Sequence, residues 1–195
     1  MAFEKTLEER LTAFYSIRSK TIRKIDNFYS ATYPLILDFF REKINRPDFA
    51  EVDAKLGVVL VYSWMAPAKL NVDYLKKYEP AKSAIEKIRS GEGINRAQLE
   101  SMIAFVGGSL IETSKYLHFL CPARFAIWDR RVAWAAYRLN HHYQYNNLEL
   151  YLTYLDDLKK WRWIPMNAQQ NDPGLATDMR KKELALFELG ISEQT

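Results

Sequence analysis

Apolar residues recur at spacings of three and four along most of the chain, and turn-forming residues separate these repeats. This period places apolar side chains on one face of an α-helix, whereas a strand would alternate strictly. The pattern therefore predicts an all-α protein, a compact bundle of about eight to nine helices. The expected helices span residues 7–29 with a break near Ser19, 33–44, 48–65, 72–90, 95–105, 109–120, 129–139, 147–161 and 175–189.

Prolines and glycines mark several of the expected helix boundaries. Pro34 is expected in the first turn of its helix, where the amide that proline lacks has no helical partner. Pro80 is expected to split the segment 72–90 after Tyr78, because proline removes a hydrogen bond and restricts the residue before it. Gly107-Gly108 lie between two apolar repeats and are typical of a helix stop.

The 195 residues, 48% of them hydrophobic, suffice for one sizeable core or two small lobes. No internal repeat, low-complexity tract or linker divides the chain. We therefore expect a single all-helical domain over residues 1–195. Two lobes around a cleft remain open, with the cleft between the early helices and the helices of residues 109–139.

Several functional classes lack support in the sequence. The lone cysteine, Cys121, excludes an internal disulfide and a cysteine-rich zinc site, and fits a cytoplasmic protein. His141-His142 stand apart from other ligand-type residues, so we expect no metal and no cofactor. The longest apolar stretch, 56–66, is too short for a bilayer, and the first ten residues lack the apolar run of a signal peptide.

Basic residues exceed acidic ones by four, a modest excess that fits a polyanion partner. Three basic segments are candidates for phosphate contact, although each equally fits a solvated surface. They are residues 18–24, Arg130-Arg131 and Arg180-Lys181-Lys182. Residues 159–163 interleave basic residues with tryptophans, a combination found in single-strand-binding segments and also at ordinary helix ends.

Lys115 lies in an apolar segment, 110–121, in which Glu112 carries the other full charge. A helix that is apolar on most faces is usually buried, so the amine is expected at the edge of an apolar cleft. Burial lowers a lysine pKa, and the neutral amine is the nucleophilic form. The alternative is a lysine that reaches solvent or pairs with Glu112.

Asp129 follows an apolar run and precedes the helix expected over 129–139, which is the position of an N-cap. A carboxylate at a helix start stays ionised, because amide donors and the helix dipole favour the anion. Asp129 could therefore cap its helix and also stabilise positive charge on a sugar ring.

The stretch from Lys115 to Val132 resembles the helix-hairpin-helix DNA glycosylases, in particular the 8-oxoguanine DNA glycosylase fold and its small prokaryotic relatives. In that family a lysine precedes an aspartate by one helix and a turn, and the aspartate stands in a Val-Asp-x-x-Val or Trp-Asp-x-x-Val setting. Residues 128–132, Trp-Asp-Arg-Arg-Val, match this setting. The resemblance implies a DNA glycosylase and AP lyase acting on duplex DNA with a modified base. Lys115 would be the Schiff-base nucleophile and Asp129 the stabilising carboxylate.

The chain departs from the family at the hairpin. A Gly-x-Gly turn normally precedes the lysine directly, whereas residues 112–114 here are Glu-Thr-Ser and the glycines lie at 107–108. These glycines could still offer amides to a phosphate. The residues expected to contact DNA or the base are Gly107, Gly108, Ser114, His118, Trp128, Arg130 and Arg131.

Two other functions remain open. The chain could be a helical DNA-binding or protein-interaction module with this fold and no catalysis. It could also be a structural protein whose aromatic residues all belong to the core.

Overall fold

A computed structural model describes residues 2–18, 27–44, 46–64, 69–162 and 177–194. These residues form helices and no strand, as predicted. The helices are α1 (Ala2–Arg18), α2 (Asn27–Ile44), α3 (Glu51–Ser63), the 3-10 helix η1 (Val72–Lys77), α4 (Tyr78–Arg89), α5 (Arg96–Val106), α6 (Leu110–Leu120), α7 (Arg130–Tyr137), α8 (His142–Tyr145), α9 (Leu148–Lys160) and α10 (Asp178–Gln194). None of these helices has the length and apolar character needed to cross a membrane.

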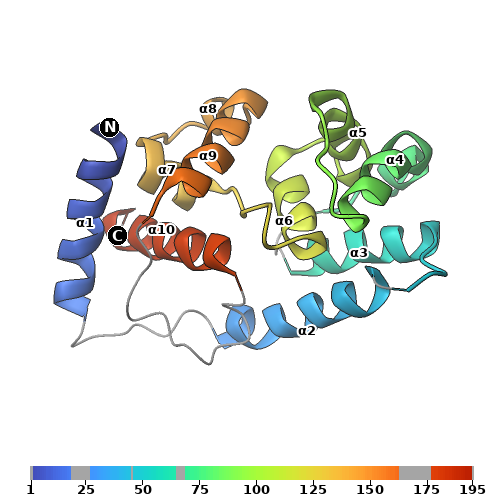
Figure 1. Ribbon diagram of the computed structural model, residues 1–195, viewed down its shortest axis with the longest axis horizontal. Coiled ribbons are helices and arrows are strands. Elements are labelled where there is room, and N and C mark those ends of the chain that lie inside the picture. The colour runs from blue at the N-terminus through green and yellow to red at the C-terminus, as the bar shows by residue number, and fades with distance from the viewer. Residues whose placement is uncertain (1, 19–26, 45, 65–68, 163–176, 195) are drawn as a thin grey trace.

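The helices form two groups (Figure 1). The first helix group contains α2 to α6 and η1, with α6 packed against α2, α3 and α5. The second helix group contains α1 and α7 to α10, with α10 packed against α1, α7 and α9. The boundary falls in residues 121–129, between α6 and α7. This boundary therefore divides residues 109–139, a segment whose helices the sequence analysis groups on one side of a possible cleft.

Polar residues begin four of the helices, among them Asp129, the one that the sequence analysis predicts as an N-cap. Asn95, Ser109, Asp129 and Asn147 are the N-caps of α5, α6, α7 and α9, and each side chain accepts a hydrogen bond from an amide of the first turn. These bonds satisfy donors that have no partner within the helix. The caps explain why four predicted helix starts agree with the structure to within one residue.

The prediction for Pro34 is wrong, because α2 starts at Asn27 and the proline lies inside the helix. Tyr33, Ile36, Leu37 and Phe40 follow helical spacing and are all buried. Packing of this stripe stabilises the helix on both sides of the proline, although proline interrupts the hydrogen-bond ladder.

The segment 72–90 is divided near Pro80, one residue earlier than predicted: η1 ends at Lys77, and Pro80 lies in the first turn of α4. The short helix α8 was not predicted. The proposed break near Ser19 and the start of the helix expected at residue 175 lie outside the described residues.

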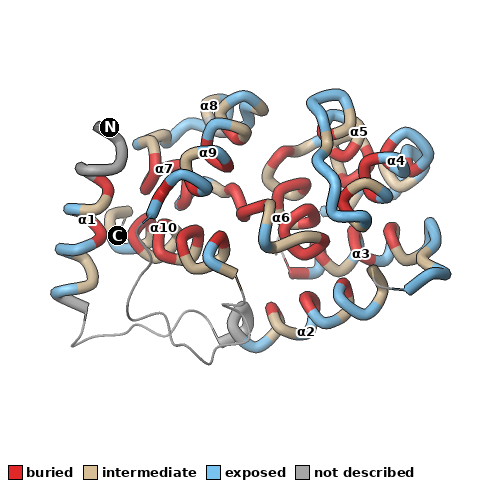
Figure 2. Tube along the Cα trace, in the orientation of Figure 1, coloured by how far each residue is buried: buried red, intermediate tan, exposed pale blue. Residues whose placement is uncertain are grey.

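Buried residues run through both helix groups and along the segment that joins them (Figure 2). Within the joining segment, Phe125, Ala126, Ile127 and Trp128 are all buried. The indole of Trp128 packs against Tyr154 of α9, with ring centroids 4.8 Å apart. The segment is therefore a packed part of the core, and its last buried residue directly precedes Asp129.

Candidate active site

Lys115 and Asp129 come from different helix groups and are brought together by Ser114. The Ser114 hydroxyl accepts a hydrogen bond from the amide of Trp128 at 3.0 Å and lies 3.2 Å from the carbonyl oxygen of the same residue. Ser114 directly precedes Lys115, and Trp128 directly precedes Asp129. One buried side chain thus joins α6 to the start of α7 at the two candidate catalytic residues.

Asp129 is the N-cap of α7, as predicted, and its Oδ1 accepts a hydrogen bond from the amide of Val132 at 2.9 Å. The residue is half-buried. Its backbone is extended while the next residue is helical, which is the geometry of a capping residue. The carboxylate is therefore held in one orientation by the helix that it begins.

Lys115 is half-buried on α6, between the fully buried residues Ser114 and Tyr116. Burial lowers the pKa of Lys115 below its ordinary value of 10.5, and the carboxylates of Asp129, Glu112 and Glu183 oppose this shift. The net lowering increases the share of neutral amine near neutral pH. A neutral amine beside carboxylates is equipped for nucleophilic attack on carbon.

Glu183 of α10 is the principal site residue that sequence reasoning missed. Burial raises the pKa of Glu183 to about 7, while Arg180 acts to lower it, Asp129 to raise it and Lys115 to lower it. The sequence carried a signal, because Glu183 stands between Met179 and Leu186 at spacings of four and three. Both of these neighbours are buried, and so is Glu183.

An open depression of about 500 Å³ lies where α6, α7 and α10 meet. Its lining residues combine the candidate carboxylate with two arginines and apolar side chains: Ile111, Asp129, Arg130, Arg131, Ile191 and Gln194. Ile111 lies one helical turn before Lys115 on α6. A ligand in this depression would therefore meet the Asp129 carboxylate and approach the face of α6 that carries the lysine.

The two arginines that begin α7 are both exposed, as contact with phosphates would require. Arg130 donates a hydrogen bond to Gln194 at 3.3 Å. The guanidinium of Arg131 lies over the ring of Phe187, 5.1 Å from its centroid. Their positions at the rim of the depression agree with the predicted role, which stays a prediction.

His118 and Trp128 occupy positions that do not suit the base contacts predicted for them. Both are 0% exposed. The two ring nitrogens of His118 bond to the Tyr33 hydroxyl at 2.7 Å and to the carbonyl of Phe125 at 2.8 Å. Neither ring has a free face for stacking, and we therefore correct their role to packing. Ser114 likewise joins α6 to Trp128 inside the core, which leaves its hydroxyl no access to DNA.

Gly107 and Gly108 form the turn between α5 and α6, and both have positive φ, +150° and +77°. Their amides donate to the carbonyl of Ile103 at 3.3 and 2.7 Å. A side chain at Gly107 would collide with the Tyr62 hydroxyl, 1.8 Å from an added Cβ. The glycines therefore act as a helix stop, the alternative left open by the sequence, and do not present these amides to a phosphate.

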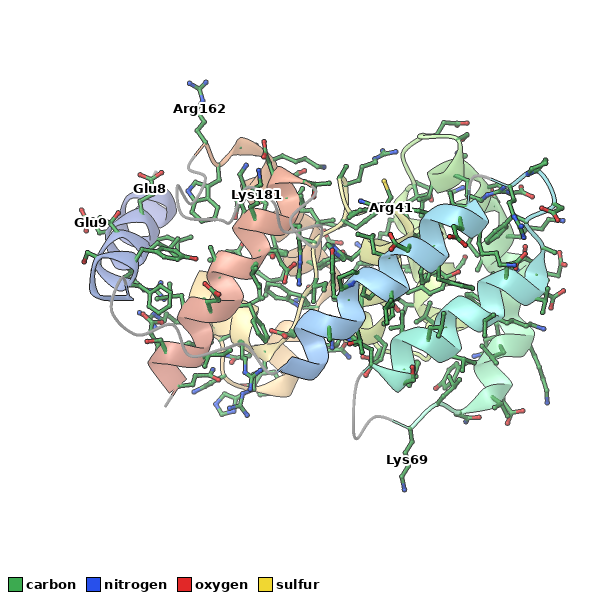
Figure 3. The ribbon with its side chains drawn as sticks, turned by 90° about the horizontal axis from the view of Figure 1, so that it is seen from below. Glu8, Glu9, Arg41, Lys69, Arg162 and Lys181 are labelled. Atoms are coloured by element: carbon green, nitrogen blue, oxygen red, sulfur yellow. The ribbon has the colours of Figure 1, made fainter. Side chains whose placement is uncertain are left out.

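The predicted phosphate contacts of the other basic segments are also corrected in part. Arg180 is almost buried and pairs with Glu183, and the Lys182 ammonium donates to the carbonyl of Leu158 at 2.8 Å, so neither faces a surface polyanion. Trp161 is 1% exposed and belongs to the core. The neighbouring Arg162 projects away from the body (Figure 3). Residues 19–24 and 163 lie outside the described residues.

No cluster of three or more His, Cys, Asp or Glu side chains suited to a metal ion occurs in the part of the chain that the structure describes. Comparisons with protein-family models, curated proteins and solved structures gave no match. Function is therefore inferred from the residues and their arrangement.

Proposed function

We propose that this protein is a DNA glycosylase and lyase that removes a modified base from duplex DNA. One observation carries the proposal: the buried Ser114 hydroxyl joins the residue before Lys115 to the residue before Asp129, and Asp129 lines an open depression together with Ile111, one turn before the lysine. The Lys–Asp pattern that resembles the glycosylases supplies the reaction class. An oxidised base such as 8-oxoguanine is the substrate that the resemblance favours.

The reaction follows from the chemistry of the two groups. The neutral amine of Lys115 forms a bond to C1′ of the nucleotide as the glycosidic bond breaks, and the base leaves with the bonding electrons and takes up a proton. Asp129 stabilises positive charge on the sugar. Opening of the sugar ring then gives an imine between Lys115 and C1′. This target nucleotide must leave the base stack to reach the depression.

Borohydride trapping tests the proposal, because borohydride reduces the imine to a stable protein–DNA adduct. Labelled duplexes carrying 8-oxoguanine, other oxidised bases or an abasic site are incubated with wild type and variants. We expect an adduct with wild type and with Lys82→Ala, which alters an exposed lysine of α4. Lys115→Ala should abolish the adduct. Asp129→Asn should slow it about 100-fold, since asparagine still caps the helix but lacks the charge.

An adduct that persists in Lys115→Ala would refute the assignment of the nucleophile. Absence of an adduct from wild type on every duplex would overturn the enzymatic proposal. The non-catalytic DNA-binding module would then be favoured if duplex binding weakens with salt and Lys115→Ala leaves it unchanged.

A further inference from the structure

An exposed aromatic pair, His141 and Tyr143, lies at the short helix α8 and outside the candidate active site. The two rings are stacked, with centroids 5.6 Å apart and planes inclined by 10°. Tyr143 is 76% exposed, more than any other large hydrophobic side chain among the described residues. Since His141 covers one face of the Tyr143 ring, this exposure leaves the opposite face open to a ligand.

Hydrogen bonds of the neighbouring Gln144 hold the aromatic pair in place. The side-chain oxygen of Gln144 accepts from the amides of Asn140 at 3.3 Å and His141 at 3.1 Å. The amide of Gln144 in turn donates to the carbonyl of His141 at 2.9 Å. These bonds fix the backbone of the residue whose ring supports Tyr143. The open ring face is therefore preorganised, which reduces the conformational entropy lost when a ligand binds.

The loop that carries the aromatic pair is anchored to both helix groups. It begins at Arg138, which ends α7 in the left-handed conformation and donates its amide to the carbonyl of Trp134 at 2.9 Å. It ends at Asn146, whose Oδ1 accepts from the amide of Leu110 at 3.3 Å. Leu110 directly precedes Ile111, which lines the depression. Helix α8 thus lies at the periphery (Figure 1), and its loop ends next to the wall of the depression.

The chain around the aromatic pair is positively charged. Residues 130–148 contain three arginines and no aspartate or glutamate, a formal charge of +3. The nearest acidic residue along the chain, Glu149, forms an ion pair with Arg96 of α5. Arg138 is paired with Glu193, yet its side chain is 48% exposed. A positive segment beside an open aromatic ring is the combination by which proteins bind single-stranded nucleic acids.

The geometry of the aromatic pair favours a nucleobase as its ligand. A base presents a flat π-face, so stacking can continue from His141 through Tyr143 to the base. The phosphates on either side of such a base would meet the positive segment of residues 130–148. A protein partner would also gain from burying the Tyr143 ring, but the absence of acidic residues gives it no comparable advantage.

We propose that His141 and Tyr143 form a stacking site for an unpaired base of single-stranded DNA. Tyr143 contacts the base, and His141 is a positioning residue that supports the Tyr143 ring from behind. The positive segment attracts the phosphates. The stacking site goes beyond the proposed reaction, because it takes a base outside the depression and does not use Lys115.

Fluorescence anisotropy with two labelled strands of equal length tests the stacking site. One strand is oligothymidylate, and in the other every nucleotide is abasic. Both carry the same phosphates, so the ratio of their affinities isolates the contribution of the bases. Wild type should bind oligothymidylate about 10-fold more tightly, which is the order of effect of one base stacked on an aromatic side chain. Tyr143→Ala should remove this preference, and Tyr143→Phe should keep it.

Salt dependence and a matched control separate stacking from other effects. The slope of log affinity against log salt reports phosphate contacts, so Tyr143→Ala should leave the slope unchanged. Leu35→Ala is the control, because it removes a side chain that is 68% exposed on α2, in the first helix group. This variant should bind both strands as wild type does. Equal unfolding temperatures of wild type and variants would show that the folds are intact.

Equal affinities of wild type for the two strands would overturn the proposal, as would a preference that survives in Tyr143→Ala. Loss of self-association in Tyr143→Ala with the preference unchanged would also overturn it, and would assign the ring to a protein contact. Borohydride trapping gives an independent result. A preference that depends on Tyr143 without any adduct would reject the glycosylase function alone, whereas an adduct without the preference would reject the stacking site alone.

Discussion

The buried His118 predicts a specific loss of stability in acid. Its Nδ1 donates to the Phe125 carbonyl, since a carbonyl can only accept, and its Nε2 therefore accepts a hydrogen bond from the Tyr33 hydroxyl. This arrangement requires the neutral ring. Burial lowers the pKa of His118 from 6.5 to about 3, and the Arg180 charge acts in the same direction.

The magnitude follows from the two pKa values. The unfolded chain protonates this histidine as the pH falls through 6.5, whereas the folded protein does not until about pH 3. Protonation therefore favours unfolding throughout this window, by about 1.4 kcal/mol for each pH unit. At pH 5 the cost is about 2 kcal/mol.

Urea unfolding at pH 7 and pH 5 measures this cost. His118→Gln should be less stable than wild type at pH 7, because its hydrogen bonds are altered. However, its free energy of unfolding should fall by about 2 kcal/mol less between the two pH values. The exposed His141 provides the control, and His141→Gln should keep the wild-type difference. Equal losses in wild type and His118→Gln would refute the reasoning, as would an imidazolium NMR signal from His118 at pH 5.

Three further substitutions test the packing around the site by chemical denaturation. Gly190→Ala should cost about 1–3 kcal/mol, because the added Cβ would collide with the Arg131 carbonyl oxygen; unchanged stability would contradict the contact. Ser114→Ala should cost about 1–3 kcal/mol and speed hydrogen exchange of the Trp128 amide, which loses its acceptor; slow exchange in this variant would argue against the bridge. Tyr33→Phe leaves a buried ring nitrogen without its donor and should cost a similar amount, about 1–3 kcal/mol, whereas a neutral effect would count against that bond.

The local features of this fold could be read from the sequence because each depends on neighbouring residues. Ser109 and Asp129 start their helices through bonds to amides two and three positions away, and Gly107 ends a helix through its own backbone freedom. Pro34 could not be placed correctly, because its helix depends on buried contacts with other helices.

The same distinction applies to the candidate site. Lys115 and Asp129 were identified from a short pattern whose spacing is set by one helix and a turn. Glu183 was missed because its burial depends on how α10 packs against α7 and α9, which no local pattern encodes. His118 and Trp128 were assigned to the surface of the site because sequence proximity does not reveal which way an aromatic side chain is directed.

The contact between the first and last helices has a consequence for how the molecule is assembled during synthesis. Arg10 of α1 pairs with Glu193 of α10, 183 positions later, at 2.7 Å, and also donates to the carbonyl of Ala135. The first helix group is one continuous stretch of chain, whereas the second brings together segments 183 positions apart, which carries a larger cost in loop-closure entropy. A nascent chain in which α10 has not yet been made therefore has Lys115 and Asp129 but not the depression beside Asp129, because Ile191 and Gln194 of α10 line it.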